Sequence, residues 1–185
     1  MKKLLIVLLL WCPLGFAQQS AYEFDSAHTK IVFKLETGLH TVHGDFKLKR
    51  GIVRYDAATG KASGEIVIDA TSGNSNSESR DHRMHKNVLE SAKFTDITFV
   101  PDRLDGRVAN EGESEVKLHG MMTLLGKEHE MTLPAKVQPT KEGLSVSTHF
   151  VVPYIQWGLK NPSTFVLRVS HDVQIEIEAT LGATK

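Results

Sequence analysis

Apolar and polar residues alternate along most of the chain, and this period of two is typical of β-strands with one buried and one exposed face. The last row is the clearest, because Val173, Ile175 and Ile177 alternate with glutamine and glutamate. Turn-forming residues such as Gly126-Lys127 separate the rows at short intervals. This pattern predicts an all-β domain, either a sandwich or an antiparallel barrel. The other rows are Ile31, Phe33 and Leu35; Val42, Gly44, Phe46 and Leu48; Ile66 and Ile68; Leu118, Gly120, Met122 and Leu124; and Leu144, Val146, Thr148, Phe150 and Val152.

One segment breaks the alternation and predicts a short helix. A polar loop rich in serine, asparagine and glycine covers Ser72 to Ser79, and the predicted helix covers Arg80 to Ala92. Either Ser79 or Asp81 is expected to cap its first turn, because short polar side chains bind the free amide groups there. The apolar face of this helix would consist of Met84, Val88 and Leu89.

The N-terminal segment has the three parts of a secretory signal peptide. Two lysines are followed by an unbroken apolar run from Leu4 to Leu10, and small residues precede a cleavage point after Ala17. The apolar run is too short for a permanent membrane anchor. We therefore predict a signal peptide over residues 1–17, one domain over residues 18–185, and a periplasmic or secreted protein.

Cys12 is the only cysteine of the chain, and it lies inside the predicted signal peptide. A lipoprotein anchor at Cys12 is the weaker alternative, because the bulky Trp11 occupies the position where such a cleavage site needs a small residue. Once the signal peptide is removed, the chain has no disulfide, no thiol nucleophile and no cysteine metal site. Its stability must then come from an apolar core.

Charge narrows the range of partners. The chain has 22 basic and 22 acidic residues, and removal of the two signal-peptide lysines leaves a net charge of about −2. This balance is not that of a nucleic-acid-binding domain. Beyond the signal peptide, no apolar run is long enough to span a bilayer. The oligomeric state stays open, with a homodimer as one option.

Motifs for catalysis are weak. The sequence lacks a Gly-x-Ser-x-Gly nucleophile elbow and a His-Glu-x-x-His zinc motif. Two histidine pairs, His40 with His43 and His82 with His85, have spacings compatible with metal ligation, but a zinc site needs three or four ligands. We predict a protein that is not an enzyme and has no metal. The alternative is a metal-dependent enzyme that uses the two pairs.

The order of several sequence blocks resembles the YceI-like family of exported lipid-binding proteins, over nearly all of the chain from Tyr22 to Gly182. No single block is very specific, but their order and spacing make the resemblance strong. One departure follows the predicted strand that ends near Val152, where Tyr154 to Gly158 read YIQWG in place of an Asn-Arg-x-x-Phe-Gly-like segment. The matching blocks are YEFDSAHTKIVF from Tyr22, HGDF from His43, GIVRYD from Gly51, GEIVIDA from Gly64, LHGMMTLLG from Leu118 and HEMTLP from His129.

The resemblance implies an extended lipocalin-like antiparallel β-barrel of about eight strands with one short helix. It also implies an apolar tunnel that holds a polyisoprenoid, an isoprenoid quinone or a fatty amide for transport, storage or stress protection. Large apolar side chains of the alternating rows suit such a tail, because burying apolar surface yields roughly 25 cal/mol per Å². The predicted tail-binding residues are Phe33, Leu35, Phe46, Ile66, Ile68, Phe99, Met122, Leu124, Phe150 and Phe165.

Basic side chains at the start of the predicted helix could bind a polar head group. We expect this role for Arg80, His82, His85 and Lys86, with a bound long-chain lipid and no other cofactor. The alternatives are a solvated helix face and a barrel whose apolar rows fill a dry core. A dry core would leave a protein-interaction module that binds through its surface.

Overall fold

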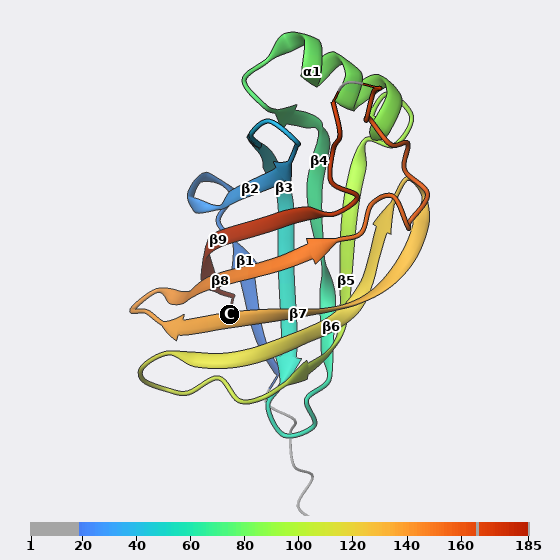
Figure 1. Ribbon diagram of the computed structural model, residues 1–185. Coiled ribbons are helices and arrows are strands. Elements are labelled where there is room, and N and C mark those ends of the chain that lie inside the picture. The colour runs from blue at the N-terminus through green and yellow to red at the C-terminus, as the bar shows by residue number, and fades with distance from the viewer. Residues whose placement is uncertain (1–18, 166, 185) are drawn as a thin grey trace, which may run out of the picture.

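The computed structural model describes residues 19–165 and 167–184 (Figure 1). The predicted signal peptide and its cleavage point lie outside these residues. Strands dominate the fold, and in the described part of the chain no helix is long and apolar enough to cross a membrane. The strands are β1 (Gln19–Phe24), β2 (Lys30–Glu36), β3 (Thr41–Asp56), β4 (Ala62–Asn74), β5 (Asp96–Asp105), β6 (Ser114–Leu124), β7 (Lys127–Pro139), β8 (Gly143–Val152) and β9 (Val173–Ala183).

The strands form a closed antiparallel β-barrel with eight strand positions, as predicted. The hydrogen-bonded order runs β3-β2-β9-β8-β7-β6-β5-β4, and β4 pairs with β3 to close the ring. β1 and β2 share one position, because both pair with β3 on one side and with β9 on the other. A single 3-10 turn over Ser26–His28 separates them, and the Asp25 carboxylate accepts hydrogen bonds from the amides of Ala27 and His28.

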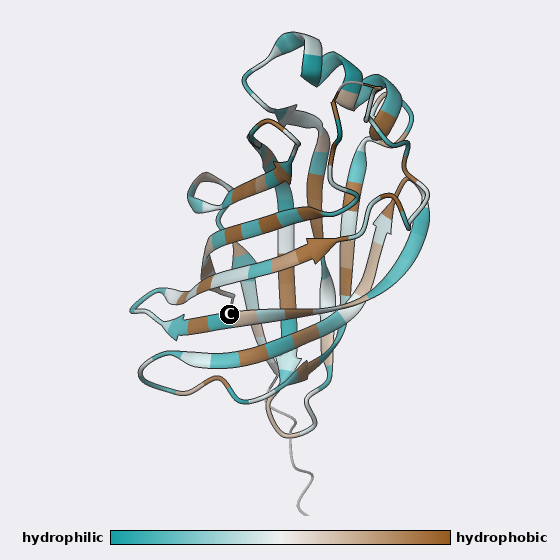
Figure 2. Ribbon diagram, in the orientation of Figure 1, coloured by the Kyte–Doolittle hydropathy of each residue, from teal (hydrophilic) through white to brown (hydrophobic). Residues whose placement is uncertain are grey.

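Hydrophobic and hydrophilic residues alternate along the strands (Figure 2). Burial shows that the predicted apolar rows face the barrel interior and that their polar neighbours face outward. On β8, Leu144, Phe150 and Val152 are buried, whereas Val151 between them is exposed. One glycine in these rows, Gly44, is needed for a steric reason. A Cβ atom at Gly44 would lie 2.3 Å from the ring of Phe33 on the paired strand, so only glycine lets this ring lie flat against β3.

The helical segment differs from its prediction. It begins at Glu78 with the α-helix α1 (Glu78–Arg83) and continues as a π-helical turn over Met84–Val88, so it starts two residues earlier and ends sooner than expected. Ser77 occupies the capping position without a side-chain hydrogen bond, so the predicted caps are wrong. The Asp81 carboxylate instead binds the amide and hydroxyl of Ser75, a contact outside the helix that local sequence rules do not foresee.

Buried apolar side chains form two clusters, one at each end of the barrel. The first lies at the end that α1 covers and includes Leu89, Phe99, Met122 and Phe150. The second lies at the opposite end and consists of Val116, Val137, Leu144, Ala179 and Leu181, with Tyr22 and Phe24 of β1 packed against it. We call these the cavity end and the packed end.

Candidate lipid-binding site

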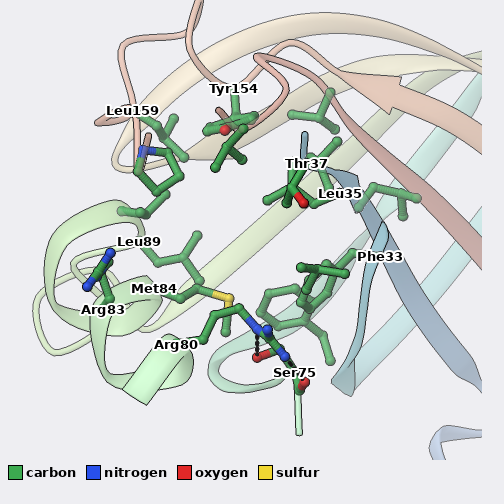
Figure 3. Close-up of a pocket in the computed structure, with 18 of the residues that line it drawn as sticks. Phe33, Leu35, Thr37, Ser75, Arg80, Arg83, Met84, Leu89, Tyr154 and Leu159 are labelled. Atoms are coloured by element: carbon green, nitrogen blue, oxygen red, sulfur yellow. Dashed lines mark hydrogen bonds between the residues drawn. The ribbon is translucent and has the colours of Figure 1, made fainter. Parts of the chain in front are cut away.

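A cavity of about 370 Å³ occupies the cavity end (Figure 3). Its walls are inward-facing apolar side chains from every barrel strand except β1 and β7. The alternation of each strand supplies these residues, because every second side chain points inward. The wall residues on the strands are Ile31, Phe33, Leu35, Val42, Phe46, Ile68, Ile97, Met122, Leu124, Phe150, Val152, Val173 and Ile175.

Two segments cover the mouth of the cavity. The first is the helical segment, whose Met84, Val88 and Leu89 all face the cavity, as the predicted apolar face requires. The second is the β8–β9 connection, residues 153–172, which supplies Tyr154 and Leu159 among others. Figure 1 shows this connection beside α1 at the top of the barrel.

The β8–β9 connection is fastened to both of its neighbours. The Gly38 amide in the β2–β3 turn donates to the carbonyl of Arg168 at 2.9 Å. On the helical side, the Lys160 ammonium lies 3.6 Å from a carboxylate oxygen of Glu90. This second contact is an exposed ion pair and contributes little energy, at most about 1 kcal/mol. The cover is therefore held to the β2–β3 turn by a backbone hydrogen bond, and to the helical segment by this ion pair and by apolar packing of Tyr154 and Leu159 in one cluster with Leu89.

Polar groups on the cavity wall are few and concentrate near α1. The guanidinium of Arg80 donates to the hydroxyl and carbonyl oxygens of Ser75, at 2.7 and 2.6 Å. Ser75 is almost fully buried, so it fixes the direction of the Arg80 side chain (Figure 3). Arg83 lies one helical turn further on and also lines the cavity, and its side chain is exposed to solvent. Among the described residues, Arg83 makes no ion pair or side-chain hydrogen bond.

Tyr154 places a neutral phenol in the cover. Its side chain is 4% exposed, and its hydroxyl donates to the carbonyl of Ser170 at 2.6 Å. Burial, with a smaller contribution from the charge of Asp172, raises the pKa of Tyr154 to about 12. The phenol therefore carries no charge near neutral pH, and its hydrogen bond stabilises the fold of the connection.

Most of the predicted tail-binding residues come together on the cavity wall. Three do not. Ile66 and Phe99 belong to the surrounding core without reaching the cavity, and Phe165 is 99% exposed in the β8–β9 connection, where no strand alternation directs side chains inward. Phe99 instead packs on Gly120, where a Cβ atom would lie 2.9 Å from its ring. The seven on the wall are Phe33, Leu35, Phe46, Ile68, Met122, Leu124 and Phe150.

Of the four predicted head-group residues, only Arg80 lies on the cavity wall. His82 and Lys86 are exposed and do not line the cavity. His85 braces the helical segment, because its two ring nitrogens lie 2.9 Å from the Ser91 hydroxyl and 2.8 Å from the Gly73 carbonyl. Arg83 is the basic residue that the prediction missed. Its spacing of three from Arg80 places both on one helix face, and this signal was available in the sequence.

The histidine pairs do not assemble with further ligands in the described residues, which contain no group of three side chains suited to hold a metal ion. His119, on the outer face of the barrel, lies between two carboxylates. Its ring nitrogens lie 2.6 Å from Asp102 and 2.9 Å from Glu130. The hydrogen bond to Asp102, followed by that to Glu130, raises the pKa of His119.

A closed antiparallel barrel with an apolar cavity beneath a short helical cover defines the lipocalin-like class of folds. The family comparison then specifies the class. The model of the YceI-like domain matches residues 22–181, and the chain belongs to this family. No functionally curated protein matches the sequence.

Solved structures share this fold at low sequence identity. BcnA of Burkholderia cenocepacia is 18% identical, with a TM-score of 0.68 and coverage of 87% of this chain and 99% of that one. A polyisoprenoid-binding domain of Saccharophagus degradans, implicated in plant cell wall breakdown, is 15% identical, with a TM-score of 0.65 and coverage of 88% and 98%. The YceI protein of Campylobacter jejuni is 18% identical, with a TM-score of 0.58 and coverage of 73% and 80%.

Proposed function

We propose that the protein binds the tail of one long-chain lipid, such as an isoprenoid, without covalent chemistry, and that it carries or stores this lipid outside the cytoplasm. The observation that supports this most directly is the cavity itself, whose strand walls are entirely apolar. A packed core would fill such a space with side chains. An apolar space of this size, bordered by Phe33, Met122 and Phe150, suits an apolar guest.

The energetics support binding without any chemical step. Burying roughly 300 Å² of apolar tail at about 25 cal/mol per Å² returns about 7 kcal/mol before the costs of association. A binding site of this kind needs few polar groups beyond those that orient one end of the ligand. We therefore propose a binding protein that is not an enzyme. The predicted signal peptide supports its export.

The test is native mass spectrometry of the protein purified from its own periplasm, followed by organic extraction of any bound mass. We expect one lipid per protein. In Val42→Trp the new indole would fill the cavity, since Val42 lies on its wall, and the lipid should be lost.

The matched control is Val151→Trp, which adds the same ring to an exposed position on the outer face of β8. This variant should keep its lipid. A bare mass for the wild type, together with no uptake of any long-chain lipid on titration, would overturn the proposal.

A further inference from the structure

Charge is distributed unevenly around the cavity. The side chains that line it include Arg80, Arg83 and His40, but no aspartate or glutamate. This imbalance does not follow from the composition, because the whole chain has equal numbers of basic and acidic residues. The cavity is therefore apolar along its strand walls and basic at its mouth.

Neither of the two nearest carboxylates in the helical segment lines the cavity. Asp81 accepts hydrogen bonds from Ser75, which also holds Arg80, so Asp81 offsets charge beside Arg80. Glu90 pairs with Lys160. Arg80 is already oriented by Ser75, whereas Arg83 has none of its donors occupied by a side chain of the described residues. A guanidinium that borders an apolar cavity recognises carboxylate or phosphate oxygens better than neutral groups, since its planar donors match them in pairs.

The depth of the cavity limits the length of the lipid tail that it can hold. Its wall on β2 runs from Ile31 to Leu35 and continues to Thr37 at the mouth. These six residue steps cover about 20 Å at roughly 3.3 Å per residue, or about 15 Å along a barrel axis tilted by about 40°. The side chains of the packed end fill the barrel beyond this point, with Ile177 in contact with both clusters.

An extended chain advances about 1.2 Å per bond, because a three-bond residue spans at most about 3.6 Å. The cavity therefore accommodates a tail of roughly 12 to 16 bonds, which corresponds to about three or four isoprene units or a fatty chain of similar length. We propose that the ligand is an acidic amphiphile with such a short tail, and that Arg83 binds its carboxylate or phosphate head. This inference rests on the proposed function and narrows it.

The first test compares ligands that differ only in the head group. Tetradecanoic acid is compared with tetradecanol, and farnesyl phosphate with farnesol, by titration calorimetry at neutral pH and low salt. We expect each anionic ligand to bind at least tenfold more tightly than its alcohol, and the two anionic ligands together identify which head is preferred. Equal affinities for acid and alcohol would overturn the inference while leaving the proposed function intact. No binding of any of the four would count against both.

The second test uses a matched pair of variants. In Arg83→Gln the affinity for the acid should fall about tenfold, while that for the alcohol stays unchanged. Lys86→Gln removes a positive charge from the same helical segment; Lys86 is exposed, as Arg83 is, but it does not line the cavity. We expect no more than a twofold effect there. Equal losses in the two variants would show a general charge effect and overturn the role of Arg83.

A series of fatty acids tests the depth. Affinity should rise with length up to about 16 carbons and then stop rising. A continued rise to 20 carbons or more would mean that the packed end opens, and it would overturn the limit on tail length. Alcohol binding in the same series serves to confirm that each protein sample is folded and competent.

Discussion

The two ends of this barrel are built by the same strands, yet one is filled and the other is hollow. On β8, Leu144 belongs to the packed end, and Phe150, six residues later, borders the cavity. At the packed end, side chains from several strands meet one another, and β1 adds Tyr22 and Phe24. At the cavity end, Phe33 lies flat against Gly44, and a helical cover replaces further filling. A closed barrel thus fixes the wall, and what covers each end decides how much space remains.

The largest loss of stability should come from a substitution at the packed end. Leu144→Ala would leave a new void in a close-packed cluster and lower the free energy of unfolding by about 3 kcal/mol. Leu124→Ala, at an equally buried leucine that already borders the cavity, should cost about half as much, because fewer contacts are lost. Urea unfolding of both variants without lipid measures the difference. Equal losses would mean that the two ends are packed alike.

Gly44→Ala should disturb the hollow end. The added Cβ atom would meet the Phe33 ring and the Asn74 carbonyl oxygen, so we expect a loss of about 2 kcal/mol, as for overpacking in a core. The Phe33 ring would also be pushed into the cavity and reduce lipid uptake. Adding Phe33→Leu should restore only part of the stability, since the contact with the Asn74 backbone remains. Complete restoration would contradict the backbone contact.

A smaller effect is expected from His85→Ala, which removes the two contacts that brace the helical segment. The Gly73 carbonyl and the Ser91 hydroxyl would each lose a partner, which costs about 1–2 kcal/mol in total. Hydrogen exchange should become faster in α1 and the following π-helical turn, with little change in the packed end. His82→Ala, at an exposed neighbour, is the control. Uniformly faster exchange over the whole barrel would argue against a local bracing role.

The smallest effect on stability should come from His119, which lies on the outer face of the barrel, and it should depend on pH. The pKa of His119 is raised by Asp102 and Glu130, so its stabilising contribution is complete below the ordinary histidine pKa and is lost as pH rises through the raised value. The stability difference between the wild type and His119→Gln should therefore be larger at pH 5.5 than at pH 8.5. Urea midpoints at the two pH values measure it. A difference that grows with pH would contradict the assignment.

Much of the wall could be predicted from the sequence, because alternation states which side chains point inward. Alternation does not state what lies opposite each of them. Phe99 and Phe150 are both buried and were both predicted to bind the tail, yet only Phe150 reaches the cavity, since Gly120 on the paired strand makes room for the Phe99 ring. This difference depends on neighbours from distant parts of the chain.

The cover was harder to predict than the wall. It consists of a short helical segment and a connection without regular strands, where periodicity gives no direction for a side chain. Phe165 was expected at the cavity and is exposed, whereas Arg83 was not selected and lies on the wall. The helix start was misplaced because Asp81 binds Ser75 rather than capping the first turn. Contacts between separate segments determine all three outcomes.

The pairing of β9 with β1 and β2 has a consequence for how the protein forms. Tyr22 pairs with Ala183 and Ile31 with Ile177, so a complete ring needs contacts between residues that lie far apart in the sequence. Such non-local contacts form slowly, because a long stretch of chain must be ordered first. Val173 and Ile175 of β9 are part of the cavity wall. The binding space therefore comes into existence only when β9 pairs with β2 and β8, and a lipid can occupy it only in a chain in which β9 has joined the barrel.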